Sequence, residues 1–539
     1  MKADKLILGN VITLDPRNPV MKAVTVKDGL VQYVGSERMA RKLCDENTEV
    51  MDYGDNYIYP GFIEAHCHGA MAGPRLAFYA ALNDGQTMDE YVEILKKYID
   101  EHPDNNFYYG AGWAEKDKEP TAAMLDAICT DKPIALNSVD GHSLWFNTKG
   151  MEVFGINEEA VKTWGTDIIR VNEDGTPTGY ISEGPVISIL TKMGKMSDED
   201  LKKAFLVWQD FALSQGITAY YEAGVTDHYL EIIDQLIKEG KVKLRIFAGY
   251  MLNERDEDYV VGVEKAKAAA LKYNNEHMKI IGVKIFMDGV VEAHTAWMDE
   301  EYTDRPGYFG VKRFCDLDRV VELYKAANCA GLNVHQHTIG DGAVRFALDC
   351  MEEAQTQMGK MDNRNALCHL QVVRKEDVKR LCELNAIAVV APLWMARADG
   401  YYEQSVKYIG EKRTFYGYPL KSFTDNSGIY AFHTDFPVSP EMSIPRSIFM
   451  ACQRNQPDSE EFYQWNANEC ISREDAIKGL TAGPAYSVKA EDHLGALMIG
   501  YAANMCVYDT DFIHADIEDV PKGKLLATII DGDVAYEAE

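Results

Sequence analysis

Two histidines separated by one residue are the most informative chemical feature of the sequence. His66 and His68 follow directly after the apolar run of residues 59–63. Alternate residues of a β-strand face the same side, so both imidazoles can point into one space at the end of a strand. This spacing favours a shared metal ion, since neutral imidazole is a common ligand of zinc. Buried histidines that only form hydrogen bonds in a core are the alternative for such a pair.

Three further residues could complete a metal site. His337, His369 and Asp435 each lie at the carboxyl end of a different apolar segment. In a barrel of parallel strands these ends meet at one face, where active sites form. Several imidazoles and one carboxylate suit zinc or a similar divalent ion. A position left open in such a site binds water and lowers its pKa towards neutrality.

A lysine lies in another of these segments. Lys284 is part of Val-Lys-Ile-Phe-Met-Asp, residues 283–288. A positive ammonium group that faced a metal site would be strongly disfavoured, so the lysine is expected to be neutral there. The neutral amine can react with carbon dioxide to form a carbamate, an anion that can bridge two metal ions. An ion pair with Asp288 or Glu222 is the alternative.

Apolar strand-like segments alternate with amphipathic helical segments through the middle of the chain. This alternation is typical of βαβ units and a parallel sheet. The eight expected strands comprise residues 58–64, 219–222, 244–250, 282–286, 332–335, 366–368, 386–390 and 429–433. Eight such strands predict an α/β fold, a distorted (β/α)8 TIM-type barrel. A doubly wound open sheet is the alternative that the periodicity leaves open.

Both ends of the chain are rich in short strands and turns, and a long insert separates the first two barrel strands. We expect residues 1–56 and 491–539 to form a small β-sandwich-like domain, and residues 57–490 to form the barrel. The insert, at about residues 70–210, is too long for one crossover. Because loops after barrel strands form the active-site face, the insert is predicted to be a cap over the site. An insert that only adds stability is the alternative.

The composition limits the classes of partner and compartment. The 539 residues include 55 Lys and Arg and 85 Asp and Glu, a net charge of −30 that disfavours nucleic acid and anionic membranes as partners. Eleven scattered cysteines without a Cys-x-x-Cys pair are typical of reduced thiols, and no apolar run is long enough to span a membrane. A cytoplasmic protein is therefore expected. Its expected partner is a small-molecule substrate, and a homodimer is compatible with the sequence.

Several motifs resemble those of the amidohydrolase superfamily. Residues 60–68, Pro-Gly-Phe-Ile-Glu-Ala-His-Cys-His, resemble the first metal motif of these proteins. Four later motifs resemble amidohydrolase family 3, the branch that includes N-substituted formamide deformylase. They are residues 141–147, 283–289, 337–341 and 434–438. The match extends over nearly the whole chain, in the expected order.

The resemblance implies a metal-binding role for five of the candidate residues. His66 and His68 would bind one metal ion, and His369 would help to bind a second. His337 falls on a further ligand position. Lys284 would be the carboxylated lysine that bridges the two ions. The implied cofactor is one or two divalent ions per chain, with zinc as the favoured metal.

The resemblance also implies residues that act on the substrate. Asp435 would be the general base that takes a proton from the attacking water and later passes it to the leaving group. His142 and Asp288 would line the substrate pocket. Trp113 and Trp145 are also expected to line it and to favour an aromatic or apolar amide, with ordinary core packing as the alternative.

The activity that the resemblance implies is metal-dependent hydrolysis. Metal-activated hydroxide would cleave a carbon–nitrogen bond, in an amide, a formamide or a related small molecule. A deaminase and a lactone or ester hydrolase are alternatives on the same scaffold. A metal-binding protein without catalytic activity is the alternative from another class.

Four positions depart from the usual pattern of the superfamily. Glu64 stands where an Asp commonly precedes the histidine pair, and Cys368 stands where a Glu commonly precedes the last histidine. Gly342 and His294 each replace a common arginine. These changes leave the candidate ligands intact. Because these four positions differ, the substrate of another member of the superfamily cannot be assigned to this chain.

Overall fold

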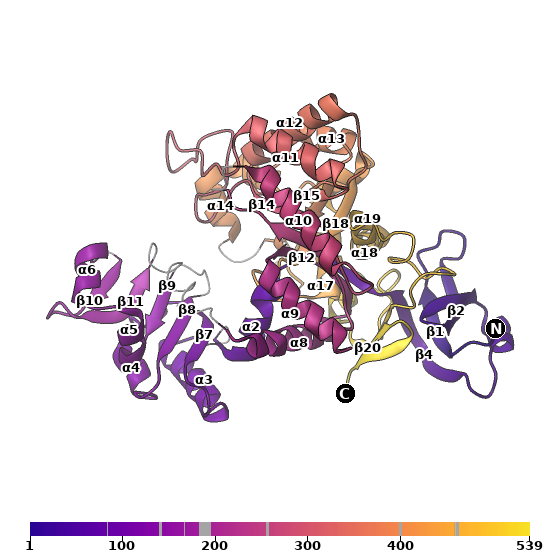
Figure 1. The fold of residues 1–539 in the computed structure, drawn as a ribbon, viewed down its shortest axis with the longest axis horizontal. Coiled ribbons are helices and arrows are strands. Elements are labelled where there is room, and N and C mark those ends of the chain that lie inside the picture. Colours follow the sequence, from indigo (N-terminus) through magenta and orange to yellow (C-terminus); the bar gives the residue numbers. More distant parts are fainter. Residues whose placement is uncertain are drawn as a thin grey trace. The chain divides into compact units, whose positions relative to one another are not determined.

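An eight-stranded parallel sheet forms the centre of the larger of two compact units (Figure 1). The computed structural model describes residues 1–82, 85–138, 143–166, 168–182, 196–254, 258–397, 401–457, 459 and 463–539. The larger unit comprises Met1–Gly69 and Gln209–Glu539, and the second unit comprises Ala70–Trp208.

The strands of the central sheet are hydrogen-bonded in the order β18-β17-β16-β15-β14-β13-β12-β5, and all neighbours run parallel. Their bounds are β5 (Phe62–Cys67), β12 (Ile217–Val225), β13 (Arg245–Met251), β14 (Met278–Phe286), β15 (Asn333–Thr338), β16 (Ala366–His369), β17 (Ile387–Val390) and β18 (Ile429–Phe432). The sheet is nearly closed into a barrel, so the predicted fold class is confirmed. Every residue of β5, β15, β16 and β17 is buried, as expected for strands covered on both faces.

The first and last strands of the barrel, β5 and β18, are held together around Glu64. The Glu64 carboxylate accepts hydrogen bonds of 2.9–3.0 Å from the backbone N–H groups of His66 and Thr434 and from the Thr434 hydroxyl. Beyond it, the N–H of Asp435 donates to the His66 carbonyl oxygen at 3.1 Å. These bonds fix the ends of the two strands side by side.

One expected strand is divided between two sheets. Residues 58–60 belong to β4 (Glu49–Pro60), which pairs with strands of the chain termini, and β5 begins only at Phe62. Gly61 separates β4 from β5. A Cβ atom at Gly61 would lie 2.3 Å from the hydroxyl oxygen of Thr218 in β12, so the close approach of the two strands requires glycine.

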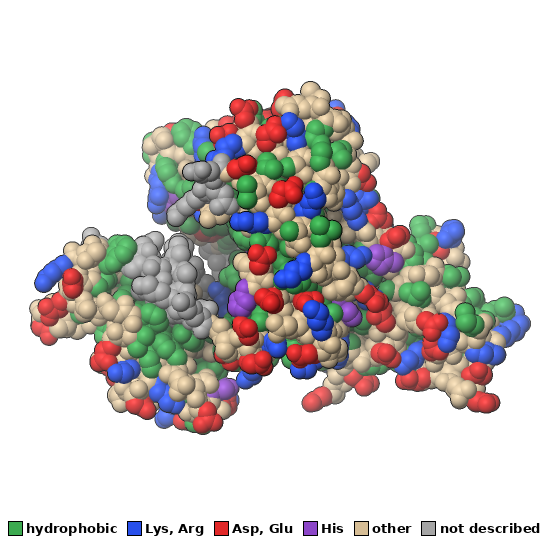
Figure 2. Space-filling model, viewed as in Figure 1, with side chains coloured by type: hydrophobic (Ala, Val, Ile, Leu, Met, Phe, Trp, Pro, Cys, Tyr) green, Lys and Arg blue, Asp and Glu red, His purple; other side chains and the backbone are tan. Residues whose placement is uncertain are grey.

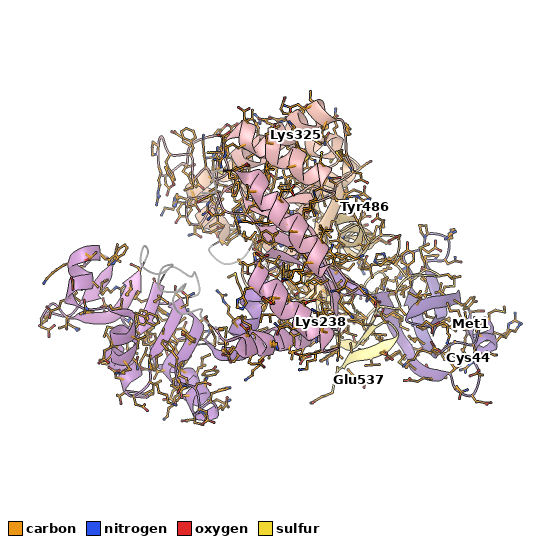
Figure 3. All side chains as sticks on the ribbon, viewed as in Figure 1. Met1, Cys44, Lys238, Lys325, Tyr486 and Glu537 are labelled. Atoms are coloured by element: carbon orange, nitrogen blue, oxygen red, sulfur yellow. The ribbon has the colours of Figure 1, made fainter. Side chains whose placement is uncertain are left out.

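Both ends of the chain contribute to a seven-stranded sheet. Its order is β21-β20-β19-β4-β1-β2-β3. The bounds of the other six strands are β1 (Lys5–Ile12), β2 (Val20–Lys27), β3 (Leu30–Gly35), β19 (Met505–Tyr508), β20 (Leu525–Ile530) and β21 (Asp533–Glu537). Met1, Cys44 and Glu537 mark this part of the molecule in Figure 3. Ile7, Ile58 and Val507 belong to its buried core.

Helices follow the strands of the barrel. Their bounds are α8 (Asp198–Ser214), α9 (Asp227–Lys238), α10 (Tyr259–Tyr273), α11 (Leu317–Cys329), α12 (Asp341–Met358), α13 (Lys375–Glu383), α14 (Tyr401–Ile409), α15 (Glu411–Phe415), α16 (Leu420–Asp425), α17 (Ile444–Gln453), α18 (Arg473–Gly479) and α19 (Ala482–Ser487). Lys238 and Lys325 mark α9 and α11 in Figure 3. Acidic and basic side chains are interspersed over the visible face (Figure 2). No helix in the described ranges is long and apolar enough to cross a bilayer.

The second unit, Ala70–Trp208, has a sheet and a core of its own. Its strands are ordered β10-β11-β9-β8-β7-β6. The bounds are β6 (Tyr79–Ala81), β7 (Tyr108–Trp113), β8 (Ile134–Ser138), β9 (Ser143–Phe146), β10 (Ile169–Val171) and β11 (Pro177–Ser182), with α3 (Met88–Glu101), α4 (Ala122–Asp126), α5 (Thr148–Phe154) and α6 (Glu158–Trp164). Leu95, Tyr108 and Leu136 are buried in its core. The role of this unit as a cap stays a prediction.

Removal of the Glu64 side chain tests how the barrel is closed. In Glu64→Ala the N–H groups of His66 and Thr434 remain buried without their acceptor, and each such group costs about 1–3 kcal/mol. We therefore expect a lower midpoint of thermal unfolding. Thr434→Val removes only the hydroxyl donor and should have a smaller effect. An unchanged midpoint for Glu64→Ala would show that the closure does not depend on this carboxylate.

Candidate metal centre

The ends of β5 and β18 bring one carboxylate against two imidazoles. Oδ1 of Asp435 lies 3.2 Å from Nε2 of His66 and 3.2 Å from Nε2 of His68. His66 is fully buried, whereas His68 is partly exposed. His66, His68 and Asp435 therefore have their polar atoms in one place. They are the residues predicted from the sequence for metal binding and proton transfer.

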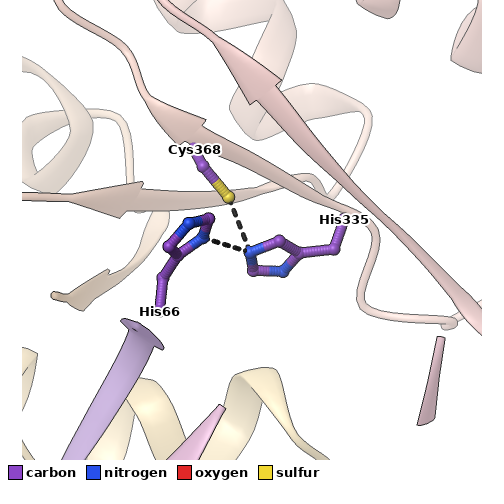
Figure 4. Close-up of side chains that lie close together, drawn as sticks. All are labelled: His66, His335 and Cys368. Carbon is purple, nitrogen blue, oxygen red and sulfur yellow. Dashed lines mark hydrogen bonds between the residues drawn. The ribbon is translucent and has the colours of Figure 1, made fainter. Parts of the chain in front are cut away.

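A third imidazole and a thiol lie beside His66 (Figure 4). Nε2 of His335 is 2.7 Å from Nδ1 of His66 and 2.8 Å from Sγ of Cys368. In the strand register, His335 is paired with Lys284 on β14. From the sequence, His335 lies on the same face of its strand as His337, two residues away, but core packing is the favoured interpretation for it.

Three further histidines complete a cluster of rings. The ring centre of His369 lies 5.0 Å from that of His66, 4.6 Å from that of His337 and 5.0 Å from that of His433. His369 and Asp435 both have left-handed backbone, with φ of 78° and 59°. This conformation is uncommon outside glycine and is often found at functional sites.

Several buried atoms of the cluster have no hydrogen-bond partner within the described ranges. They are Nδ1 of His369, both ring nitrogens of His433 and Oδ1 of Asp435, whose contacts with the imidazoles of His66 and His68 are not aligned as hydrogen bonds. Buried polar atoms in proteins are nearly always satisfied, and an ion is one explanation for exceptions. Imidazole nitrogens and a carboxylate oxygen are also a suitable donor set for zinc. The residues of the cluster thus fit a divalent metal ion.

Lys284 points towards the same cluster. Its Nζ atom lies 3.5 Å from Nε2 of His66 and 4.8 Å from the ring centre of Phe286. The side chain is fully buried, and this burial lowers the pKa of Lys284 below its ordinary value. The neutral amine required for carbamate formation is therefore favoured at this position.

Burial also sets the protonation of the rings and of the thiol. Burial lowers the pKa of His66, His335 and His369 well below the ordinary histidine value, and it lowers the pKa of His433 to about 3. These imidazoles are neutral, which is the form that binds metal. Burial raises the pKa of Cys368 to about 12, so its thiol is neutral. The usual Glu at that position is replaced by an uncharged group.

The two carboxylates near the strand ends respond differently to their surroundings. Burial raises the pKa of Glu64 to about 8, although the hydrogen bonds from His66 and Thr434 oppose this shift. Burial acts to raise the pKa of Asp435, but the contact with His68, with smaller contributions from His433 and Lys284, outweighs it and holds the pKa below its ordinary value. Asp435 is therefore the carboxylate that stays ionised beside the candidate ligands.

The structure corrects the expectation that Asp288 lines the substrate pocket. Asp288 is fully buried, and its Oδ1 lies 3.0 Å from Nδ1 of His337. The same carboxylate accepts hydrogen bonds from the backbone N–H groups of Trp297, Ile339 and Gly340. Asp288 therefore orients the ring of His337, as carboxylates commonly do for metal-binding histidines.

The other residues expected to contact substrate lie elsewhere. Trp113 and Trp145 are 1% and 0% exposed in the core of the second unit, with ring centres 5.6 Å apart. Their indole N–H groups donate to the carbonyl oxygens of Leu136 and Thr121. Both are core residues of that unit, which differs from the predicted pocket lining. His142 lies outside the described residues.

A cavity of about 380 Å³ adjoins the cluster. It is lined in part by Trp394, whose indole is stacked on His369 with ring centres 5.4 Å apart, and by Ile339. Its volume is within the range of sites for small molecules, about 300–1,000 Å³. His294, the replacement for a common arginine, does not line this cavity and instead contacts Asp304 at 2.9 Å.

Comparisons with known proteins agree with this geometry. The family model described as "Amidohydrolase family" matches residues 49–536. N-substituted formamide deformylase of Arthrobacter pascens is 23% identical over 99% of this chain and 98% of its own length. Putative amidohydrolase YtcJ of Bacillus subtilis (strain 168) is 24% identical over 98% of each chain.

Two solved structures resemble the whole fold. An uncharacterized metal-dependent hydrolase from Pyrococcus horikoshii OT3 has a TM-score of 0.78 at 23% identity, covering 95% of this chain and 99% of its own. An uncharacterized metal-dependent hydrolase from Pyrococcus furiosus has a TM-score of 0.76 at 26% identity, covering 94% and 99%.

The contact between His66 and His335 predicts that His335 supports metal binding. With Nε2 of His66 directed at the cluster, Nδ1 carries the proton and donates to Nε2 of His335. We expect His335→Ala to weaken metal binding by about 10–100-fold, the usual effect of losing such a partner. The affinity would be measured by competition with a chromophoric chelator.

Cys67→Ser is the matched control for this variant. Cys67 is also buried and adjoins His66 in sequence, but its Sγ contacts the carbonyl oxygen of Tyr221 at 3.9 Å. It should bind metal like the wild type. Wild-type affinity in a folded His335→Ala protein would make His335 an ordinary core residue.

Proposed function

The chain belongs to the amidohydrolase family, and on that premise we propose that it hydrolyses a carbon–nitrogen bond of an amide or formamide in a small molecule, with zinc as its metal. The observation that carries the proposal is the position of Asp435 Oδ1, 3.2 Å from Nε2 of both His66 and His68. A site that only stores metal needs no ionised carboxylate in contact with its ligands. A hydrolase needs this group as a proton acceptor.

The metal-binding roles follow from the cluster. His66 and His68 would hold one ion, and His337 and His369 would hold a second, with carboxylated Lys284 between them. A bound divalent ion lowers the pKa of water and polarises the carbonyl oxygen of a substrate. Burial keeps the imidazoles of His66 and His369 neutral and lowers the pKa of Lys284, so the surroundings favour the forms of these side chains that bind metal.

Asp435 moves the proton in this proposal. Its Oδ1 accepts a proton from the attacking water, and the same atom then gives that proton to the leaving nitrogen, so that an amine and a carboxylic acid are released. The left-handed backbone at Asp435 and the hydrogen bond from its N–H to the His66 carbonyl keep the carboxylate directed at the cluster.

The substrate class rests on the cavity and on one relative. The cavity beside His369 is mostly apolar, which suits the substituent of an N-substituted amide. One relative is named N-substituted formamide deformylase. We therefore propose that this chain cleaves the same type of bond, without assigning a particular substituent on the nitrogen.

A substrate panel with metal control tests the proposal. The purified protein would be analysed for metal and offered N-benzylformamide, N-benzylacetamide, benzyl formate and an aminopyrimidine, with release of amine, alcohol or ammonia recorded. We expect amine release, loss of it after chelation and recovery with zinc. Release of alcohol or ammonia alone would overturn the proposed bond type in favour of an esterase or a deaminase.

Asp435→Asn tests the proton acceptor separately. The amide retains the size of the carboxylate but cannot accept the proton, so kcat should fall by about 10²–10⁴-fold, the usual contribution of a general base. Metal content, measured by mass spectrometry, should persist. A variant with nearly the wild-type kcat would place the base elsewhere.

Lys284→Ala tests the bridging carbamate. The variant should lose the second metal ion and most activity, because no anion then lies between two cations. Formate or propionate in the assay should restore part of both, since a small carboxylate can occupy the vacated space. Lys284→Arg should not be restored, because the guanidinium stays protonated. Wild-type metal content and rate in Lys284→Ala would show that Lys284 does not bridge two ions, and would favour a site with a single ion.

A further inference from the structure

A carboxyl group lies inside the cavity that adjoins the metal centre. The cavity is lined mostly by apolar side chains, among them Ile339, Leu393 and Met450, yet Glu292 is also part of its wall. Glu292 is half-buried in this wall, and the partial loss of solvent raises the pKa of its carboxyl. An acidic group in such a place is costly unless a partner compensates it.

In the part of the chain that the structure describes, Glu292 has a hydroxyl partner but no cationic one. The hydroxyl of Tyr401 interacts with the Glu292 carboxyl and lowers its pKa, which opposes the effect of burial. Tyr401 in turn is 3.0 Å from Nε2 of Gln371 and 2.9 Å from the hydroxyl of Tyr418. If Gln371 and Tyr418 both donate to Tyr401, the single proton of Tyr401 is directed at the carboxylate.

No Lys, Arg or His in the described part of the chain forms an ion pair with Glu292. The other acidic residue of the wall, Glu441, differs in this respect, because its carboxylate accepts from the guanidinium of Arg446 at 3.0 Å. Within the described ranges, Glu292 is therefore a half-buried acceptor in an apolar wall that has no cationic partner.

The remaining wall of the cavity suits a cationic aromatic group. Trp394, Tyr401 and Tyr418 all line it. Aromatic rings bind planar apolar groups by stacking, and their faces also attract cations. Trp394 is at the same time stacked on His369, so a group bound in this cavity lies next to the metal centre.

We propose that this cavity binds the part of the substrate that is not cleaved, and that this part is an aromatic group carrying a positively charged nitrogen that pairs with Glu292. This inference rests on the proposed function, since it names the substrate class of the same site. The cation compensates the carboxylate, the rings enclose the aromatic group, and the amide bond extends towards Asp435.

Binding of two probes of the same shape tests the proposal without any turnover. Benzamidinium is a planar aromatic cation, and acetophenone is a neutral analogue of similar size without an amide bond to cleave. By calorimetry, benzamidinium should bind the metal-loaded protein about tenfold to a hundredfold more tightly than acetophenone, as expected for a hydrogen-bonded charge. Equal affinity of the two probes would overturn the proposal.

Two variants test whether the preference for benzamidinium over acetophenone depends on the Glu292 carboxylate. Glu292→Gln keeps the size of the side chain and removes its charge, so the preference for benzamidinium should disappear while acetophenone binds as before. Glu441→Gln, in the same wall, should keep the preference. If Glu292→Gln does not fold, Tyr401→Phe is used instead, and it should reduce the preference by removing the donor that holds the carboxylate.

The outcomes separate this inference from the proposed function. Retention of the full preference in Glu292→Gln, or its loss in Glu441→Gln, would overturn the role of Glu292 even if amides are hydrolysed. Where turnover is observed, N-[4-(aminomethyl)benzyl]formamide should exceed N-(4-ethylbenzyl)formamide in kcat/KM, and Glu292→Gln should abolish that ratio. Failure of the whole amide panel, with the binding preference intact, would reject only the proposed reaction.

Discussion

The meeting of the first and last barrel strands is the constraint on which the candidate site depends. His66 belongs to β5 and Asp435 follows β18, so the two residues lie together only because the sheet curves until its edges approach. Hydrogen bonds to Glu64 occupy the gap that remains between these edges. The unusual length of the Glu64 side chain at this position is compatible with that bridging role.

Desolvation determines the charge distribution within the cluster. The same burial that makes the barrel interior apolar keeps the inner imidazoles and the Cys368 thiol neutral and lowers the pKa of the Lys284 amine. The ionised group that remains is Asp435, in contact with the partly exposed His68. Negative charge is thus concentrated at the accessible end of the cluster, where a substrate and water would arrive.

Much of the architecture could be predicted from the sequence, because the alternation of apolar and amphipathic segments reflects the parallel barrel directly. The error at residues 58–64 arose because apolar residues continue through Gly61 while the chain changes from one sheet to another. The apolar pattern alone cannot detect this change, since residues 58–60 and residues 62–64 are all buried.

The candidate site was less predictable than the fold, for a related reason. Strand periodicity gives the face on which a side chain lies but not its neighbours, so His335 resembled a core residue and Asp288 resembled a pocket residue. Trp113 and Trp145 fit an apolar pocket and an apolar core equally well by type. The acidic residue in the cavity, Glu292, comes from a segment without any distinguishing motif.

One continuous segment of the chain belongs to two sheets, so the terminal sheet and the barrel are not independent modules. Residues 49–67 run from the sheet of the chain termini directly into the histidine cluster of the candidate metal centre, with Gly61 at the junction. In the first sheet, β4 is hydrogen-bonded to β1 on one side and to β19 on the other, strands from opposite ends of the chain. The terminal sheet is therefore not an appendage that evolution could exchange freely. It holds the strand that leads to His66, so a rearrangement of either chain end would act on the candidate ligands through the few extended residues between them.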